Sequence, residues 1–286
     1  MGRHKGSLNK ATVAKLGLPI PGKLVSVDSR TDDEILDTII ERFETYADMV
    51  RGAADNTITA TVVSGAAGIG KSYTAELALN HAKETKGTSF KIIRGAINAL
   101  DLYEQAYRYR NPKQVIVLDD ADRIFDSEDA LNLMKCLLDT SVERKVNWMT
   151  DASKFKGEDA LPKEFVYSGA MIFLTNKNFQ DYVDSGFGRY VEHMQALLSR
   201  SIYLDLKMHS RREVEIWGSH LVGRNKILQQ DGCSPGQERD AITWVKKNMY
   251  DLRELSIRTY LKLGKFMKMS TNNWERLAEI TLLRGV

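Results

Sequence analysis

Short apolar runs and longer amphipathic stretches alternate along the first two thirds of the chain. Runs such as "TATVVS" and "QVIVLD" are apolar and β-branched at consecutive positions, which is typical of strands buried on both faces. The expected strands lie within "TITATVVSG", "SFKIIRG", "KQVIVLDD", "GAMIFLTN" and "SIYLDL". Helix-like sequence, such as "TDDEILDTIIERFETYADMV" and "KSYTAELALNHAKE", occupies most of the intervals. This alternation predicts an α/β fold with a five-stranded parallel sheet that helices cover on both faces.

The pattern changes at two places. After about residue 207 the strand-like runs stop, and the remaining amphipathic segments predict a small all-helical domain over 208–286. Residues 1–27 contain five lysines and arginines and no carboxylate, so we expect a flexible basic arm ahead of an α/β domain over 28–207. Arg3 and Lys5 of this arm are candidates for contact with a narrow DNA minor groove, and a solubilising tail is the alternative interpretation.

Composition narrows the class of protein. The chain has 286 residues, 43% of them hydrophobic and 28% charged, which is ordinary for a globular protein. The net charge of +3 excludes a polycation, and the two cysteines lack metal-ligand spacing. No apolar run reaches membrane-spanning length and no secretory signal begins the chain, so we expect a cytoplasmic protein without membrane contact.

The segment "SGAAGIGKSYT" carries the first chemical signal. Gly65, four residues and then Gly70-Lys71-Ser72 match the P-loop pattern, and the loop lies between a predicted strand and a predicted helix. Glycines allow backbone N–H groups to curl around phosphate, and the lysine adds a positive charge. A glycine-rich turn without a ligand is the alternative. The residues expected to bind nucleotide are Gly65, Gly68, Ile69, Gly70, Lys71, Ser72 and Tyr73.

Polar residues end two further predicted strands. Asp119 and Asp120 follow "VIVL", where ligands bind in open parallel sheets. We expect Asp119 and the Ser72 hydroxyl to hold Mg²⁺, and Asp120 to orient or deprotonate a water molecule. Asn176 ends "MIFLTN" and could bond both that water and the γ-phosphate, although an asparagine there is often only part of a turn.

Two arginines complete the candidate chemistry. Arg200 lies between an apolar helical turn and the last predicted strand. It is either an arginine finger directed at the nucleotide of a neighbouring subunit or a surface ion-pairing residue. Arg258 lies in a predicted helix of the C-terminal domain, where it could turn toward a nucleotide between the domains.

Together these residues resemble the AAA+ ATPases. Gly65 to Ser72 match the Walker A motif and 115–120 match Walker B, while Asn176, Arg200 and Arg258 match sensor 1, the arginine finger and sensor 2. The resemblance implies a P-loop core with strand order 5-1-4-3-2, a helical lid, and ATP with Mg²⁺. It also implies a homo-oligomeric ring or spiral, with a hexamer expected. The family usually has glutamate where this chain has Asp120, which puts fast hydrolysis in doubt.

An insertion around 142–169 indicates the branch of the family. "KVNWM" and "EFVYSG" predict two strands separated by a charged loop. This segment resembles the pre-sensor-1 hairpin of helicase-like members, and "LPKEFVYSGAMIFLTN" is similar to phage- and plasmid-encoded AAA+ proteins. Lys154 and Lys156 near its expected tip are candidate nucleic-acid contacts, and a hairpin that only packs against the core is the alternative.

These features favour an ATP-hydrolysing oligomer that acts on DNA, as a replication or recombination motor or as a loader that engages a helicase or another replication protein. The alternative is an adaptor whose assembly on DNA or a protein partner is switched by ATP, with slow hydrolysis. Protein remodelling is a third interpretation, but no aromatic pore loop identifies it.

Overall fold

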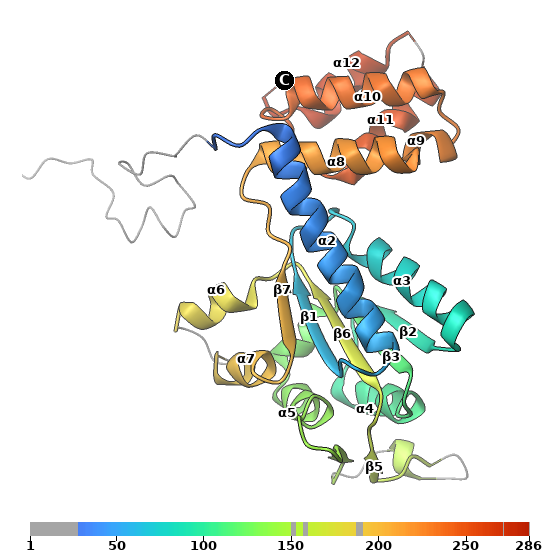
Figure 1. Cartoon of the computed structure of the whole chain (residues 1–286), viewed down its shortest axis with the longest axis vertical. Coiled ribbons are helices and arrows are strands. Elements are labelled where there is room, and N and C mark those ends of the chain that lie inside the picture. The colour runs from blue at the N-terminus through green and yellow to red at the C-terminus, as the bar shows by residue number, and fades with distance from the viewer. Residues whose placement is uncertain (1–27, 150–152, 157–159, 187–190, 271, 286) are drawn as a thin grey trace, which may run out of the picture.

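The computed structural model describes residues 28–149, 153–156, 160–186, 191–270 and 272–285 (Figure 1). Its centre is a five-stranded parallel sheet in the order β7-β1-β6-β3-β2. In chain order the strands are β1 (Ala60–Ser64), β2 (Ser89–Arg94), β3 (Gln114–Asp119), β6 (Ala170–Thr175) and β7 (Ile202–Asp205). Numbered along the chain, this order is the predicted 5-1-4-3-2, so the predicted fold class is confirmed.

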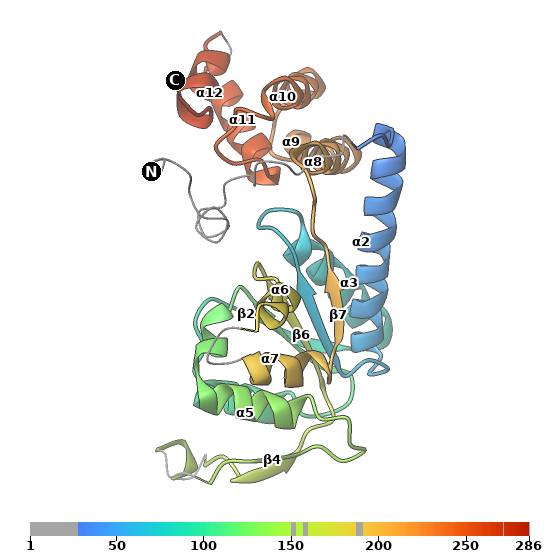
Figure 2. The same cartoon turned by 90° about the vertical axis from the view of Figure 1, so that its left-hand side faces the viewer.

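Neighbouring residues of the central strands point into two separate cores. Val62 of β1 and Phe173 of β6 pack into one core, whereas Val63 and Ile172 pack into the other. Because successive strand side chains point to opposite faces, consecutive apolar residues are required when both faces are covered. The helices divide accordingly (Figure 2): α2 (Asp32–Ala54) and α3 (Lys71–Lys86) cover one face, and α4 (Ala99–Arg108), α5 (Glu128–Leu137) and α7 (Val191–Leu198) cover the other.

Helix α2 begins where its sequence predicts. The Thr31 side chain accepts a bond from the Glu34 backbone N–H, and the Glu34 carboxylate accepts one from the Thr31 N–H at 2.7 Å. This capping box satisfies two backbone donors that a helix start otherwise leaves unpaired. The helix then buries one stripe of apolar side chains against the sheet, including Ile35, Ile39 and Phe43.

Two helical regions differ from the sequence prediction. Between β6 and β7 the chain forms α6 (Phe179–Asp184) as well as α7, where the pattern indicated only one helical turn. In the region expected to be all-helical, the amphipathic segment over 210–228 forms two helices, α8 (Arg211–Asn225) and α9 (Ile227–Gln230). Lys226, with φ of 51°, lies between them in the left-handed conformation that ends a helix.

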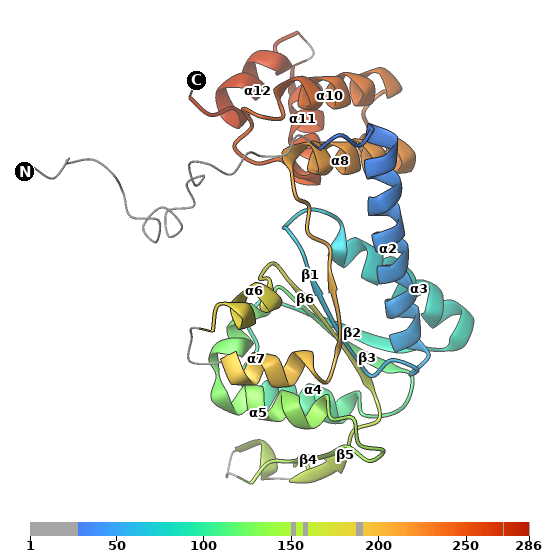
Figure 3. The same ribbon diagram turned by 60° about the vertical axis from the view of Figure 1, so that its left-hand side comes forward.

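The C-terminal helices form their own apolar core. It contains residues of α8, α9, α10 (Pro235–Asn248), α11 (Ile257–Met269) and α12 (Trp274–Leu282). These helices lie beyond the carboxyl ends of the strands (Figure 3). None of the described helices is long and apolar enough to cross a bilayer. We refer to residues 208–286, as far as they are described, as the lid.

A small hairpin lies at the opposite end of the sheet from the lid (Figures 1 and 3). Its antiparallel strands β4 (Lys145–Asn147) and β5 (Glu164–Val166) pair as predicted, and η2 (Ser153–Phe155) is a single turn of 3-10 helix between them. The buried Arg144 guanidinium anchors the base of the hairpin by donating to the carbonyls of Leu137 and Gly169 at 2.8 and 2.7 Å.

Candidate functional site

A cavity of about 210 Å³ lies where the carboxyl ends of β1, β3 and β6 meet the lid. Its walls come from four segments that are distant in sequence. The lining residues are Ala67, Gly68, Gly70, Lys71, Ser72, Tyr73, Asp119, Asp120, Asn176, Ile257 and Arg258. The fold therefore brings together most of the predicted nucleotide-binding, metal-binding and catalytic residues.

The glycine loop is pressed against the start of α11. Gly68 has φ of 74° and Gly70 has φ of 102°, conformations that an L side chain rarely adopts. A β-carbon on Gly68 would also lie 2.8 Å from Cβ of Ser256. The Gly68 carbonyl accepts a bond from the Ile257 N–H at 3.1 Å, so the backbone of the lid is bonded directly to the loop.

Two side chains outside the glycine loop bond its backbone carbonyls. The Trp217 indole of the lid donates to the Ile69 carbonyl at 2.8 Å, and the Tyr46 hydroxyl of α2 donates to the Lys71 carbonyl at 2.9 Å. Gly65 and Ile69 belong to the loop but do not line the cavity. Ile69 is buried, and its side chain packs into the core beneath α2 and α3 and so fixes the loop to the domain.

Lys71 has neutral hydrogen-bond partners. Its ammonium group donates to the carbonyls of Gly65 and Ala66 at 2.6 and 2.9 Å and to the Asn176 amide oxygen at 2.8 Å. Burial lowers the pKa of Lys71, while the charges of Asp120 and Asp119 act in the opposite direction. A buried ammonium without a bonded carboxylate is suited to receive an anionic phosphate.

Ser72 and Asp119 form the candidate metal site. The Ser72 hydroxyl donates to one carboxylate oxygen of Asp119 at 2.8 Å, and Asp119 is only 5% exposed. A hydroxyl and a carboxylate this close are hard oxygen donors of the kind that Mg²⁺ prefers beside phosphates, so the residues fit that ion.

The second Asp119 oxygen has a partner that the sequence reading missed. Nε of Arg94 donates to it at 3.2 Å, and Nη2 of the same arginine donates to Glu76 at 2.9 Å. Arg94 ends β2 and is paired in register with Asp119 on β3. The sequence feature that could have predicted this contact is that two expected strands both end in charged residues, one basic and one acidic.

Asp120 and Asn176 are bonded to each other. The Asn176 amide nitrogen donates to the Asp120 carboxylate at 2.7 Å, while its oxygen accepts from Lys71. Asp120 has φ of 54°, a conformation uncommon for a residue other than glycine, and strained backbone of this kind is frequent at functional sites. Asp122 accepts a bond from Thr175 at 2.7 Å, so its carboxylate is held by the sheet.

A larger cavity of about 490 Å³ adjoins the first. The two share Gly70, Tyr73 and Ile257. Phe43 stacks on Trp217 with ring centroids 4.3 Å apart, and His220 stacks on the same indole at 5.7 Å. Burial and the nearby Arg224 charge lower the pKa of His220, which favours its neutral form. This aromatic cavity beside the glycine loop has a suitable position and character for a nucleotide base.

The two predicted arginines occupy different ends of the sheet. Arg258 is exposed at the start of α11 and lines the cavity. Arg200 precedes β7, which ends at Asp205 beside Ser64 and therefore beside the glycine loop. Arg200 consequently lies at the amino edge of the sheet, where it donates to the Ala196 carbonyl at 2.9 Å, and it does not line this cavity.

Of the four predicted nucleic-acid residues, the structure describes Lys154 and Lys156. Lys154 pairs with Asp101 at 2.5 Å and also with Glu104, and Phe155 packs edge-on against Tyr103. Lys156 is exposed. These contacts favour the packing alternative for Lys154, whose role on nucleic acid stays a prediction. Arg3 and Lys5 lie outside the described residues.

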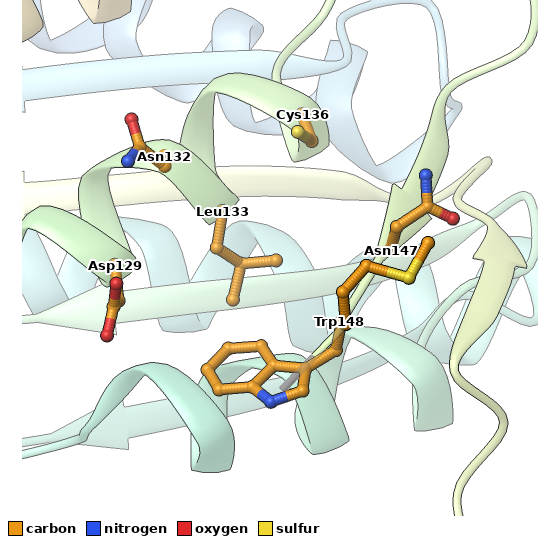
Figure 4. Close-up of a pocket in the computed structure, with 7 residues that line it drawn as sticks. Asp129, Asn132, Leu133, Cys136, Asn147 and Trp148 are labelled. Atoms are coloured by element: carbon orange, nitrogen blue, oxygen red, sulfur yellow. The ribbon is translucent and has the colours of Figure 1, made fainter. Parts of the chain in front are cut away.

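A separate cavity of about 220 Å³ lies between α5 and the hairpin. In Figure 4, Leu133 of α5 points toward the indole of Trp148, which follows β4. The exposed Cys136 and Asn147 lie at its rim. None of the predicted site residues lines this cavity, so it is distinct from the nucleotide site.

The strand order, the glycine loop, the paired acids with Asn176, and the helical lid are features that this protein shares with P-loop proteins of the AAA+ class. The chain is 35% identical over 266 residues to the uncharacterized 36.7 kDa protein in the nrdC-mobD intergenic region of Enterobacteria phage T4. The match covers 93% of this chain and 81% of the phage protein. The chain belongs to the same family as that phage protein.

Similarity to known proteins is otherwise distant. No family model matches the chain. NtrX from Brucella abortus in complex with ATP is 14% identical with a TM-score of 0.45, and the match covers 95% of this chain but only 56% of NtrX. The Aeropyrum pernix ORC2 protein is 13% identical with a TM-score of 0.48, covering 86% of this chain and 67% of ORC2. The assignment to the AAA+ class rests on the topology and site described above.

Proposed function

We propose that this protein is a Mg²⁺-dependent ATPase that works as a homo-oligomer on DNA. The observation that carries the proposal is the cavity in which Lys71, the Ser72–Asp119 pair and the Asp120–Asn176 pair converge at one edge of the sheet. This set combines a phosphate-binding cation, hard metal ligands and a carboxylate that can act on water.

Each residue has a distinct task in this scheme. Backbone N–H groups of the loop bind the phosphates, and Lys71 exchanges its carbonyl partners for phosphate oxygens. Ser72 and Asp119 hold Mg²⁺, which when bound neutralises charge that develops on the phosphates. Asp120 accepts a proton from the attacking water, and Asn176 orients that water beside Asp120. Arg258 brings a positive charge from the lid to the phosphates.

The position of Arg200 supports a role for a second subunit. The sheet separates it from the cavity of its own chain, because it precedes β7 and the glycine loop follows β1. An arginine finger at this position acts on the nucleotide of a neighbouring copy, as in a ring or spiral of six subunits. Catalysis then depends on assembly.

DNA is the proposed substrate because the chain has basic residues besides those that line the nucleotide cavity. The arm over 1–27 contains no carboxylate, and Lys156 is exposed beside the hairpin. Binding through lysines and arginines to phosphate is independent of sequence and sensitive to salt. In this proposal the protein is a replication or recombination motor, or a loader that engages a helicase.

An ATP-switched adaptor is the second candidate. Asp120 is shorter by one methylene than the glutamate usual in the family, and its carboxylate is bonded to Asn176. A misplacement of ~1 Å can reduce a rate ~100-fold, so slow hydrolysis would let ATP act mainly as an assembly signal.

One experiment separates these candidates. ATP hydrolysis is measured with no DNA, single-stranded DNA and double-stranded DNA, and the mass of the protein is measured with and without ATP. DNA-stimulated turnover supports the motor or loader. ATP-dependent assembly without stimulation supports the adaptor, and failure to bind ATP refutes both.

A further inference from the structure

Arg94 makes an unusual contact for a residue on an edge strand. Its Nε lies 3.2 Å from the Asp119 carboxylate oxygen that Ser72 does not bond, and its Nη2 lies 2.9 Å from Glu76 on α3. The Arg94 side chain is 57% exposed, whereas the Asp119 side chain is 7% exposed. One half-exposed cation therefore connects a buried carboxylate to a surface carboxylate.

In the metal-free protein, the ionised carboxylate of Asp119 requires a positively charged partner. An ionised carboxylate with little access to water is costly unless a cation or several donors compensate it. The Ser72 hydroxyl is neutral, and Lys71 is bonded to Gly65, Ala66 and Asn176 instead. Among the described residues, Arg94 is the cation that hydrogen-bonds to Asp119.

Arg94 and Mg²⁺ would therefore bind the same carboxylate. Ser72 bonds one oxygen of Asp119 and Arg94 bonds the other, so a metal ion bound beside Ser72 would share the negative charge of this carboxylate with Arg94 and weaken the Arg94 contact. By linkage, the free energy lost from the Arg94 contact is then subtracted from the free energy of metal binding. The Glu76 contact allows Arg94 to remain paired when its contact with Asp119 weakens.

We propose that Arg94 is the resident counter-ion of the metal site, a positioning residue that holds Asp119 until Mg²⁺ binds. This inference rests on the proposed function, because it requires Asp119 to receive the Mg²⁺ of a bound nucleotide. Arg94 thereby stabilises the empty site and weakens its binding of Mg²⁺-nucleotide.

The test is the affinity of the full chain for Mg²⁺-ATP, measured by calorimetry on the wild type and on Arg94→Gln. Glutamine can still donate a hydrogen bond but has no charge to compete with the metal. Because half-exposed pairs are worth little, Mg²⁺-ATP should bind about two- to fivefold more tightly to Arg94→Gln. The melting temperature of the nucleotide-free variant should fall, and Mg²⁺ alone should restore part of the loss.

Two further variants make the result specific. Arg51→Gln removes a surface arginine that pairs with Asp48 on α2, so it should leave Mg²⁺-ATP affinity unchanged. Arg94→Lys keeps the charge and should stay within about twofold of the wild type, since a lysine still competes with the metal as a point charge.

The possible outcomes differ in whether Arg94→Gln binds Mg²⁺-ATP more tightly or less tightly than the wild type. Weaker Mg²⁺-ATP binding by Arg94→Gln would make Arg94 a ligand of the phosphates and overturn the proposal. Affinity equal to that of Arg51→Gln would overturn it as well, because Arg94 would be only a surface ion pair. If the wild type itself does not bind Mg²⁺-ATP, the proposed function fails, and this result is separate from either outcome for Arg94.

Discussion

A buried lysine, Lys71, lies at the carboxyl end of the sheet, and a half-buried lysine, Lys154, lies at the amino end. The two lysines differ in whether carboxylates neutralise their charge. At the carboxyl edge, Lys71 is bonded to two carbonyls and an amide, all neutral. At the amino edge, Lys154 is paired with the carboxylates of Asp101 and Glu104. The first charge is available for an anion, whereas the second is already neutralised. A lysine in a promising motif is thus a phosphate ligand only when its surroundings leave the charge uncompensated.

The largest effect should come from Arg200, which we propose acts on the nucleotide of a neighbouring subunit. Arg200→Ala should retain ATP affinity and lose hydrolysis by ~10³-fold or more, as for known arginine fingers. Turnover assays and calorimetry on the same preparation check this. Mixing Arg200→Ala with Lys71→Ala protein should recover some activity, because hybrid interfaces combine an intact finger with an intact cavity. Normal hydrolysis by the single variant would place the finger elsewhere.

Asp120→Asn should come next, because an amide cannot take a proton from water. Hydrolysis should fall by ~10²-fold or more, the usual contribution of a general base. ATP binding should remain, since the hydrogen bonds of Asp120 go to Asn176 and Leu174 and not to the loop. Rates with saturating ATP, compared with filter binding, separate the two quantities. An unchanged rate would show that another group positions the water, and Asp122 is the next candidate.

Lys71→Ala should weaken ATP binding. Loss of a charged hydrogen-bond donor to phosphate should raise the dissociation constant by about 10- to 150-fold, from the usual 1.5–3 kcal/mol for such bonds. Calorimetry with ATP measures it, and Lys86→Ala at the other end of α3 serves as the control because that lysine pairs with Asp55. Retained affinity would contradict the assignment of the loop.

The smallest effects should come from the hairpin, and they should differ between Lys154 and Lys156, the two lysines predicted to contact nucleic acid. Lys154→Ala should reduce the free energy of unfolding by about 1 kcal/mol or less and leave DNA affinity unchanged, because its charge pairs with α4. The Lys154 ammonium lowers the pKa of Glu104. The stabilisation is therefore present above the pKa of an unfolded glutamate and is lost as pH falls through the lower folded pKa, so the two proteins should converge in acid.

Lys156→Ala should have the opposite profile, since Lys156 is exposed. Its stability should match that of the wild type, whereas its DNA affinity should fall and depend less on salt, because fewer counterions are released on binding. Fluorescence anisotropy at several salt concentrations measures this. If neither variant alters DNA binding, the hairpin is a packing element, and the arm over 1–27 becomes the candidate DNA contact.

Most elements of the core could be read from the chain, because local signals were strong where the sheet is buried on both faces. The runs around Val62 and Val117 have the consecutive apolar positions that such strands require, and Thr31 with Glu34 marks the start of α2. Helix α6 was missed because six residues are too few for a helical period to stand out. The break at Lys226 was missed because a lysine with positive φ has no sequence signature.

By itself, the sequence determined the alternation of strands and helices, the conformation of the glycine loop, and the identity of the acids at the end of β3 and of the asparagine that follows β6. These features depend on neighbouring residues and on periodicity, which the chain encodes locally. Tertiary structure alone decided which polar groups meet: Arg94 bonds Asp119 from another strand, Lys154 of the hairpin bonds Asp101 of α4, and Trp217 of the lid bonds the Ile69 carbonyl. Electrostatic and hydrogen-bond energies depend on distance in space, and each of these pairs is separated by more than twenty positions along the chain.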